Sequence, residues 1–174
     1  MRKYYLCHNH LMIKTTICVD IYGNRFDIAT DSLTWRPAVY GIVIKDSEVL
    51  LSKQFGNKYG LPGGGLKLGE IPEDGVIREI KEETGIDVIN PKITGLENSF
   101  FKSSHSIDNN AYHSLLIYYI CEYSGGQLST SGFDKDERIN SELAEWINVD
   151  DIDSLELAST VDFRPYIKKH ILTN

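Results

Sequence analysis

The sequence predicts an α+β domain in which a mixed β-sheet is packed between helices. The chain has 174 residues, the length of one domain or of one domain with an extension. Its composition, 41% hydrophobic and 25% charged, is that of a protein with a buried core. Segments with strand character outnumber helical ones and do not alternate with them one by one, as they would in a parallel βαβ fold. We therefore expect a mixed sheet covered by few helices.

An N-terminal tail and β-hairpin, residues 1–34, are predicted to precede the main domain at 35–174. Residues 15–30 (TTICVDIYGNRFDIAT) contain two β-rich segments on either side of the turn sequence YGN. Upstream, the tract CHNH at 7–10 offers metal-ligating side chains, but no second Cys/His pair follows to complete a zinc site. We therefore expect a loose tail before the hairpin.

The main domain is predicted to start with a second hairpin at 38–53, where AVYGIVI and VLLSK flank the polar turn KDSE. These strands are more apolar than those of the first hairpin, so we expect them to be more deeply buried. The remaining elements expected after the first helix are strands at 87–96, 113–123 and 144–149, a polar loop at 124–141, and a closing helix at 164–171 with cations in its last turn.

The best-marked helix is predicted for residues 72–84, directly after a glycine-rich segment. Val76 and Ile80 lie one turn apart and form an apolar stripe. Pro72 suits the first turn of a helix, and Gly85 suits the left-handed residue just beyond its end. The bounds of this helix are therefore well defined by the sequence.

Another face of this helix is acidic. At about 100° per residue, Glu82 and Glu83 fall on either side of Glu79, so the three carboxylates share one face. Like charges at this spacing repel by ~0.2–0.5 kcal/mol per pair. The helix alone allows a solvated acidic face, or a site for Mg²⁺ or Mn²⁺, which prefer carboxylate and water ligands. Glycines at 63–65 favour the second interpretation, because backbone without Cβ lets a ligand approach closely.

Residues 64–86 also follow a specific spacing pattern. Gly64 is followed after five residues by Glu70, and after seven more by the run REIKEETGI, which starts at Arg78. This segment resembles the Nudix box, G-x5-E-x7-R-E-U-x-E-E-x-G-U with U aliphatic, at every fixed position. Nine specified positions make the match far more specific than a short glycine motif. The chain is thus similar to the MutT-like Nudix hydrolase family over about residues 35–150.

The resemblance implies an α/β/α sandwich that hydrolyses the pyrophosphate bond of a nucleoside diphosphate linked to another group, with Mg²⁺ or Mn²⁺ as cofactor. By position, it implies that Glu79, Glu82 and Glu83 are the metal ligands. It gives catalytic roles to Glu79 and Glu82, and to a pair between Arg78 and Glu70 that holds the loop and helix in shape.

The same resemblance places the glycine loop at the substrate. Gly63, Gly64 and Gly65 are its candidate substrate-binding residues, and Gly64 would set the loop. Arg36 precedes a predicted core strand and is a candidate contact for a phosphate or a base. A surface cation is an equally good interpretation of Arg36.

The general base and the substrate stay open. Glu79 is the first candidate for the base, with Glu137 and Glu142, in or after the polar loop, as alternatives. Similar proteins that act on ADP-ribose or diadenosine polyphosphates carry a proline or a tyrosine about 16 residues beyond the box, where this chain reads FFKSS. The S-Q-P-W-P-F-P-x-S array of the NADH-cleaving group is also missing. Aromatic candidates for stacking on a base or sugar, each with ordinary packing as the alternative, are Phe55, Tyr59, Phe100, Phe101 and Phe133.

Two other functional classes are less well supported. A non-catalytic Nudix-fold domain that senses a nucleotide metabolite is the main alternative, but such domains usually lose box carboxylates, and all are present here. An isopentenyl diphosphate isomerase would need a catalytic cysteine, whereas Cys121 lies in an apolar segment. Hydrolysis is therefore the preferred hypothesis.

Charge and composition restrict partners and location. Eighteen basic against 25 acidic residues leave a net charge of −7, which argues against sequence-independent binding of nucleic acid. The apolar run at 115–121 is far shorter than the ~20 residues of a membrane span. Three cysteines without C-x-x-C spacing favour reduced thiols. We expect a cytoplasmic protein with a small nucleotide substrate and neither nucleic-acid nor membrane partners; by analogy, the N-terminal hairpin is a candidate for homodimer formation.

Overall fold

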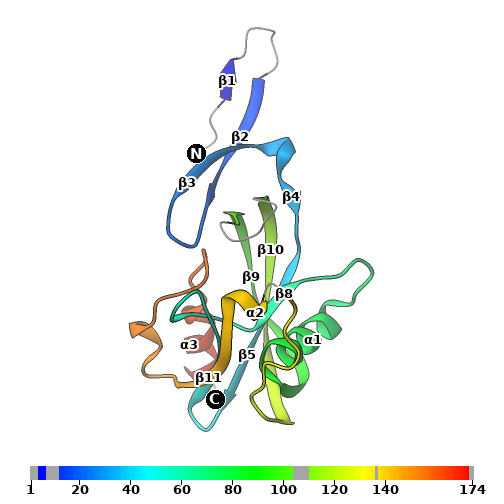
Figure 1. Ribbon diagram of the computed structural model, residues 1–174, viewed down its shortest axis with the longest axis vertical. Coiled ribbons are helices and arrows are strands. Elements are labelled where there is room, and N and C mark those ends of the chain that lie inside the picture. The colour runs from blue at the N-terminus through cyan, green and yellow to red at the C-terminus, as the bar shows by residue number, and fades with distance from the viewer. Residues whose placement is uncertain (1–3, 7–11, 104–109, 136, 173–174) are drawn as a thin grey trace.

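A computed structural model describes residues 4–6, 12–103, 110–135 and 137–172 of the chain (Figure 1). A mixed β-sheet lies between α1 on one side and α3 on the other, which confirms the predicted α+β sandwich. The helical elements are α1 (Pro72–Thr84), α2 (Glu137–Asn140), α3 (Arg164–Leu172) and the 3-10 turns η1 (Thr30–Ser32) and η2 (Ile152–Ser154). The strands are β1 (Tyr4–Leu6), β2 (Met12–Val19), β3 (Arg25–Ala29), β4 (Thr34–Trp35), β5 (Ala38–Lys45), β6 (Glu48–Gln54), β7 (Lys58–Gly60), β8 (Gly63–Gly65), β9 (Ile86–Lys102), β10 (Ala111–Gly126) and β11 (Ser141–Asn148).

The centre of the sheet has the strand order β9-β10-β5-β6-β11. β10 runs parallel to β5 and antiparallel to β9, whereas β6 is antiparallel to both β5 and β11. β5 and β6 pair only close to their turn, at Ile44–Val49 and Lys45–Glu48. The rest of this edge of β5 pairs with the short β8, from Ala38–Gly65 to Tyr40–Gly63. This exchange of partners places the glycine loop at the middle of the sheet.

The two faces of β5 pack against different helices. Ile42 belongs to a buried cluster that contains Ile167 of α3. Val43, which points to the opposite face, belongs to a second cluster with Ile80 of α1. Because side chains alternate along a strand, the continuous apolar run of β5 supplies both halves of the core. The second hairpin is therefore as deeply buried as its composition predicts.

Helix α1 has the bounds expected from the sequence. Pro72 occupies its first turn, and Gly85 has the left-handed backbone angle φ of 77°. The N–H of Gly85 donates to the carbonyl oxygen of Lys81 at 3.0 Å, which closes the last turn. This helix, closed at its C-terminus by Gly85, carries most of the predicted functional side chains.

The long ribbon of β9 and β10 differs from the prediction. The two strands pair from Lys102–Ala111 to Ile86–Gly126, well beyond the expected 87–96 and 113–123. The predicted loop at 124–141 is therefore wrong at both ends, because β10 continues into it and α2 forms within it. The sequence did not predict these strand ends because they contain several polar residues and lack an alternating apolar pattern. Their backbone groups pair with the partner strand, so the strands continue without that pattern.

The N-terminal region contains the predicted hairpin, formed by β2 and β3 around a turn at 20–24. In addition, β1 pairs with β2 from Tyr4–Lys14 to Leu6–Met12, so part of the expected loose tail is a strand. The CHNH tract at 7–10 lies outside the described residues. β2 meets β9 at the pair Val19–Phe101, and the turn between β2 and β3 points back toward the body of the protein (Figure 1).

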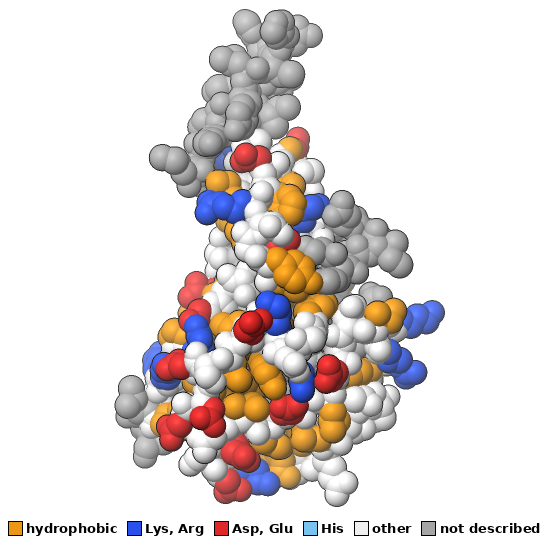
Figure 2. All heavy atoms as spheres, turned by 60° about the vertical axis from the view of Figure 1, so that its left-hand side comes forward, with side chains coloured by type: hydrophobic (Ala, Val, Ile, Leu, Met, Phe, Trp, Pro, Cys, Tyr) orange, Lys and Arg blue, Asp and Glu red, His pale blue; other side chains and the backbone are white. Residues whose placement is uncertain are grey.

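Charges of both signs are interspersed with hydrophobic side chains on the face shown in Figure 2. This face therefore has no extended region of one sign among its described residues. In the part of the chain that the structure covers, no helix has the length and apolar character needed to cross a membrane.

Candidate active site

The guanidinium of Arg78 contacts three of the predicted carboxylates. Its Nε and Nη2 donate to the two oxygens of Glu70 at 2.6 and 2.9 Å. Its Nη1 donates to Oε1 of Glu79 at 2.9 Å and to Oε2 of Glu82 at 2.8 Å. The predicted pair of Arg78 and Glu70 is thus present in two-pronged geometry, and Glu79 and Glu82 lie at the same nitrogen.

This contact has a strong electrostatic effect on both partners. The hydrogen bonds from Arg78, helped by the N–H of Lys67 at 2.9 Å, lower the pKa of Glu70 to about 2. The hydrogen bond to Glu70 is also the largest of the influences that raise the pKa of Arg78 above its usual value, and the bonds to Glu82 and Glu79 act in the same direction. Charge-assisted pairs of this kind are roughly twice as strong as neutral hydrogen bonds. The loop that ends at Glu70 is therefore fixed to α1 by a permanent ion pair.

Glu79 lies against the glycine loop. It is 8% exposed, and a Cβ at Gly64 would lie 2.8 Å from each of its two carboxylate oxygens. Only glycine leaves room for this approach without displacing the carboxylate. The backbone of β8 and the functional face of α1 are therefore brought into direct contact at Gly64.

Glu83 contacts the same loop one residue earlier, at Gly63. Its Oε2 accepts hydrogen bonds from the hydroxyl of Ser52 at 2.7 Å and from the N–H of Gly63 at 3.2 Å. Both Glu83 and Ser52 are buried. Ser52 was not a candidate from the sequence. The one available signal was its hydroxyl directly after the apolar run VLL of β6.

The carboxylates suit a divalent metal by their chemistry. Glu79, Glu82 and Glu83 offer the hard oxygen ligands that Mg²⁺ and Mn²⁺ prefer. Among the described residues, no three acidic, His or Cys side chains are already gathered closely enough to hold a metal ion. Three carboxylates, those of Glu70, Glu79 and Glu82, share the single positive charge of Arg78, so a divalent cation would improve the local balance of charge. The three carboxylates of Glu79, Glu82 and Glu83 are therefore suitable ligands for such an ion. In this structure, two of them, Glu79 and Glu82, are oriented by their hydrogen bonds with Arg78.

The later acidic candidates lie in a different environment. Glu142, on β11, has a side chain that is 59% exposed and an ion pair with Lys53 at 3.6 Å. Glu137 begins α2, but its side chain lies outside the described part of the structure. Neighbouring Glu145 accepts hydrogen bonds from Lys53 and from the hydroxyl of Tyr59, both at 2.9 Å. The Lys53 contact lowers the pKa of Glu145, and Tyr59, a predicted stacking residue, is engaged in this network.

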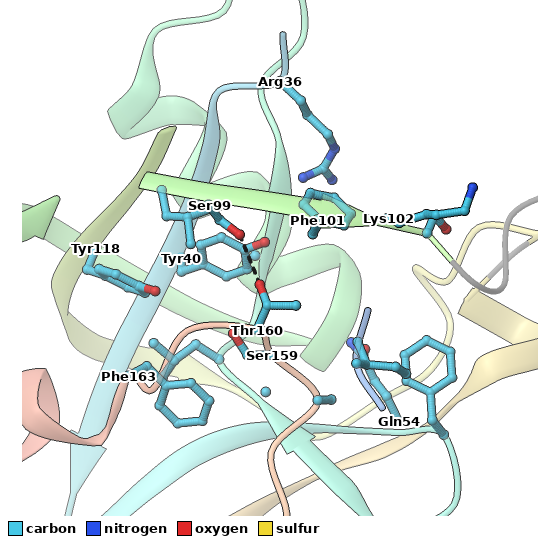
Figure 3. A pocket seen from close by; sticks show the side chains of 18 residues that line it. Arg36, Tyr40, Gln54, Ser99, Phe101, Lys102, Tyr118, Ser159, Thr160 and Phe163 are labelled. Atoms are coloured by element: carbon cyan, nitrogen blue, oxygen red, sulfur yellow. Dashed lines mark hydrogen bonds between the residues drawn. The ribbon is translucent and has the colours of Figure 1, made fainter. Parts of the chain in front are cut away.

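A pocket of about 310 Å³ adjoins the glycine loop (Figure 3). Gly63 belongs both to its lining and to the backbone that binds Glu83. Arg36 also lines the pocket, and its guanidinium atoms lie 3.2–3.3 Å from the position of a Cβ at Gly65. Arg36 therefore lies between the pocket and the loop, 6.0 Å from the ring centroid of Phe101.

The pocket wall combines rings and hydroxyl groups from distant parts of the chain. Of the aromatic candidates, Phe55 and Phe101 line it, whereas Phe100 packs against His113 and Phe133 is buried elsewhere. The sequence missed the other lining residues with rings or hydroxyls, which are Tyr40, Ser99, Ser103, Tyr118, Ser159, Thr160 and Phe163. Among the lining residues that the structure describes, none is acidic.

Comparison with known proteins assigns the chain to a family. The model of the NUDIX domain matches residues 34–169. The chain belongs to the Nudix family. As a member with a complete Nudix box, it is a pyrophosphohydrolase. An ADP-ribose pyrophosphatase of Methanocaldococcus jannaschii is 33% identical over 138 residues, which cover 67% of this chain and 78% of that protein.

Solved Nudix structures share the fold. A MutT protein from Bacillus halodurans has a TM-score of 0.59 and 26% identity, covering 80% of this chain and 83% of that one. The Nudix domain of Shewanella oneidensis NrtR, complexed with ADP ribose, has a TM-score of 0.59 and 16% identity, covering 79% and 89%. Because NrtR is only 16% identical, its similarity to this chain concerns the fold alone.

Proposed function

We propose that this Nudix hydrolase cleaves the pyrophosphate bond of a nucleoside diphosphate linked to a small group, with ADP-ribose as the first compound to test. The observation that carries this proposal is the position of the pocket, which shares Gly63 with the loop beside Glu79 and Glu83. Rings, hydroxyls and Arg36 suit a nucleoside next to a phosphate. The name of the M. jannaschii relative supports ADP-ribose as a candidate.

Each site residue has a definite part in this proposal. Mg²⁺ or Mn²⁺, held by Glu79, Glu82 and Glu83, would neutralise phosphoryl oxygens and lower the pKa of the attacking water. Arg36 would bind a phosphate oxygen at the boundary between pocket and loop. The pair of Arg78 and Glu70 keeps loop and helix in register.

Glu79 is our choice for the general base. Its carboxylate is buried at the glycine loop, where the substrate phosphates would lie. Glu142 is a weaker candidate, because it is largely exposed and its ion pair with Lys53 holds it on β11. Water would attack phosphorus directly, since neither a serine nor a cysteine nucleophile is proposed.

A second candidate function is binding of a nucleotide metabolite without hydrolysis. It is favoured by one observation: Arg78 binds two of the three proposed metal ligands, Glu79 and Glu82, at one nitrogen. In this alternative, the arginine would take the place of the cation, and the pocket would serve recognition alone. NAD-capped RNA, the substrate named for NudC of Vibrio atlanticus, is less suited to so small a pocket, and the chain matches 42% of that protein at 30% identity.

A substrate screen separates these functions. The purified protein would be incubated with ADP-ribose, ADP-glucose, UDP-glucose, NADH and nucleoside triphosphates, with Mg²⁺, with Mn²⁺ and with excess EDTA. We expect AMP to appear from at least one adenosine compound with either metal and not with EDTA. Turnover in EDTA would contradict the metal site, and calorimetric binding of ADP-ribose without turnover under any condition would support the sensor.

Two properties of the whole protein complete the proposal. Cys18 and Cys121 are free and buried, which supports a reducing cytoplasm as the location.

A homodimer formed through the N-terminal hairpin remains a proposal by analogy, and sedimentation of the full chain beside a chain lacking residues 1–34 would test it.

A further inference from the structure

The turn between β2 and β3 reaches the substrate pocket, although it belongs to the N-terminal extension. Ile21, within this turn, lines the pocket, and the next lining residue along the chain is Arg36. We infer that this turn is a specificity element, in which Ile21 limits the size of the base that the pocket accepts. The inference rests on the proposed function, because it assigns the pocket to the nucleoside part of the substrate.

The turn is held in one conformation by Asp20, which is 4% exposed. Oδ1 of Asp20 accepts the backbone N–H groups of Tyr22 and Asn24, each at 2.9 Å. Oδ2 accepts the side-chain amide of Asn24, also at 2.9 Å. A turn fixed by its own side chain presents Ile21 at a defined position. It can therefore exclude a group that is too large instead of yielding to it.

Contacts with the main domain fix where the turn lies. Val19, just before it, pairs with Phe101 of β9. The ammonium of Lys58, on β7, lies 5.7 Å from the ring centroid of Tyr22, and that of Lys102 lies 5.5 Å from the ring centroid of Phe26. Phe101 and Lys102 themselves line the pocket. The extension and the pocket wall at the end of β9 are therefore positioned together.

The chemistry of Ile21 restricts what it can do. An isoleucine offers no hydrogen bond and no charge, so its contribution is apolar contact and steric exclusion. The volume of about 310 Å³ lies at the small end of ligand pockets, where the size of one wall residue matters most. Ile21 should therefore set affinity and the choice between purine and pyrimidine, while the chemical step at α1 continues unchanged.

Four proteins test the inference: the wild type, Ile21→Trp, Ile21→Ala and Ile28→Trp. Ile28 is half-buried on β3, where it pairs with Thr16, and it does not line the pocket. Calorimetry would measure the affinities for AMP and UMP, which differ in base size and require no turnover. Kinetics with ADP-glucose and UDP-glucose would give KM and kcat for the same pair of bases. Melting curves would establish that each variant is folded.

We expect Ile21→Trp to lower the AMP-to-UMP affinity ratio by about tenfold, the discrimination typical of one added group in an apolar pocket. The ratio of kcat/KM for ADP-glucose over UDP-glucose should fall in parallel, through KM and not kcat. Ile21→Ala should move both ratios the other way, and Ile28→Trp should leave them at the wild-type value. If Ile21→Trp does not fold, the opposite shift in Ile21→Ala carries the test.

Equal ratios in the wild type, Ile21→Ala and Ile21→Trp would overturn the inference, even if every protein hydrolyses nucleotides normally. Shifted AMP-to-UMP ratios in a wild type that hydrolyses nothing would instead support the inference and refute the proposed hydrolysis. A wild type that binds neither AMP nor UMP would overturn the assignment of the pocket and this inference with it.

Discussion

Replacing Arg78 with glutamine removes the cation around which the acidic residues are arranged. The substitution keeps a polar side chain of moderate length but loses four contacts, two to Glu70 at 2.6 and 2.9 Å and one each to Glu79 and Glu82. It leaves three carboxylates, those of Glu70, Glu79 and Glu82, close together without their shared guanidinium. We expect this to destabilise the metal-free protein, because both the hydrogen bonds and the charge compensation are lost.

The size of the effect follows from the burial of the pair. Breaking a buried ion pair by removing one partner costs about 3–5 kcal/mol. The side chains of Arg78 and Glu70 are 20% and 14% exposed, so water recovers part of that loss, and we expect about 2–3 kcal/mol. At about 2–4 °C per kcal/mol for a domain of this size, the Tm should fall by about 5–10 °C.

Thermal unfolding in excess EDTA, followed by circular dichroism, measures this change. The matched control is Arg164→Gln, because Arg164 makes a similar two-pronged pair with Asp162, at 2.8 Å for each bond. Asp162 is 47% exposed, so solvent replaces that pair and the control should shift much less. Equal Tm changes in the two variants, or no change in Arg78→Gln, would refute the account of how the carboxylates are held.

Three further predictions concern other parts of the site. Gly64→Ala should keep the fold but lower kcat/KM by about 100-fold, because its Cβ must displace the Glu79 carboxylate 2.8 Å away; turnover at the wild-type rate would contradict this. Ser52→Ala should cost about 1.5–3 kcal/mol in metal-free melting, since it deletes the 2.7 Å bond to buried Glu83, whereas removal of the exposed hydroxyl in Ser154→Ala should have little effect. The third concerns Glu145, whose pKa is lowered from 4.5 chiefly by the hydrogen bond from Lys53. Because the folded pKa lies below the unfolded value, the carboxylate stabilises the fold above about pH 4.5 and this contribution is lost as the pH falls further. The difference in Tm between the wild type and Glu145→Gln should therefore be larger at pH 7 than at pH 3, and an equal difference at both would contradict the assignment.

The elements with local signals could be predicted from the sequence. Helix α1 has the expected bounds because Pro72 and Gly85 act on the backbone next to them. The hairpin of β5 and β6 could be predicted because an apolar run, a polar turn and a second apolar run are contiguous. The ends of β9 and β10 could not, because their polar residues are paired by a partner strand whose register the sequence does not encode locally.

The residues of the site can also be divided into those with a local signal in the sequence and those without one. Glu79, Glu82 and Glu83 share one helix, so their spacing places them on one face before any tertiary structure is known. Ser52 and Tyr118 reach the site region only through strand order, and Ile21 reaches the pocket only because a turn folds back onto β9. Contacts between segments so far apart in sequence depend on the register of the whole sheet.

The central claim, that Glu79, Glu82 and Glu83 hold a divalent cation, is tested most directly by melting curves with increasing Mg²⁺ or Mn²⁺. Binding to the folded state adds about 2.7 kcal/mol at a hundredfold excess over Kd, so the wild-type Tm should climb by about 5–10 °C. Glu83→Gln keeps the shape of the side chain but removes its charge, so it should lose most of this climb. Glu73→Gln, early in α1 and outside the fixed box positions, should climb like the wild type. Parallel shifts in all three proteins would contradict the claim and make the carboxylates an acidic face without a metal.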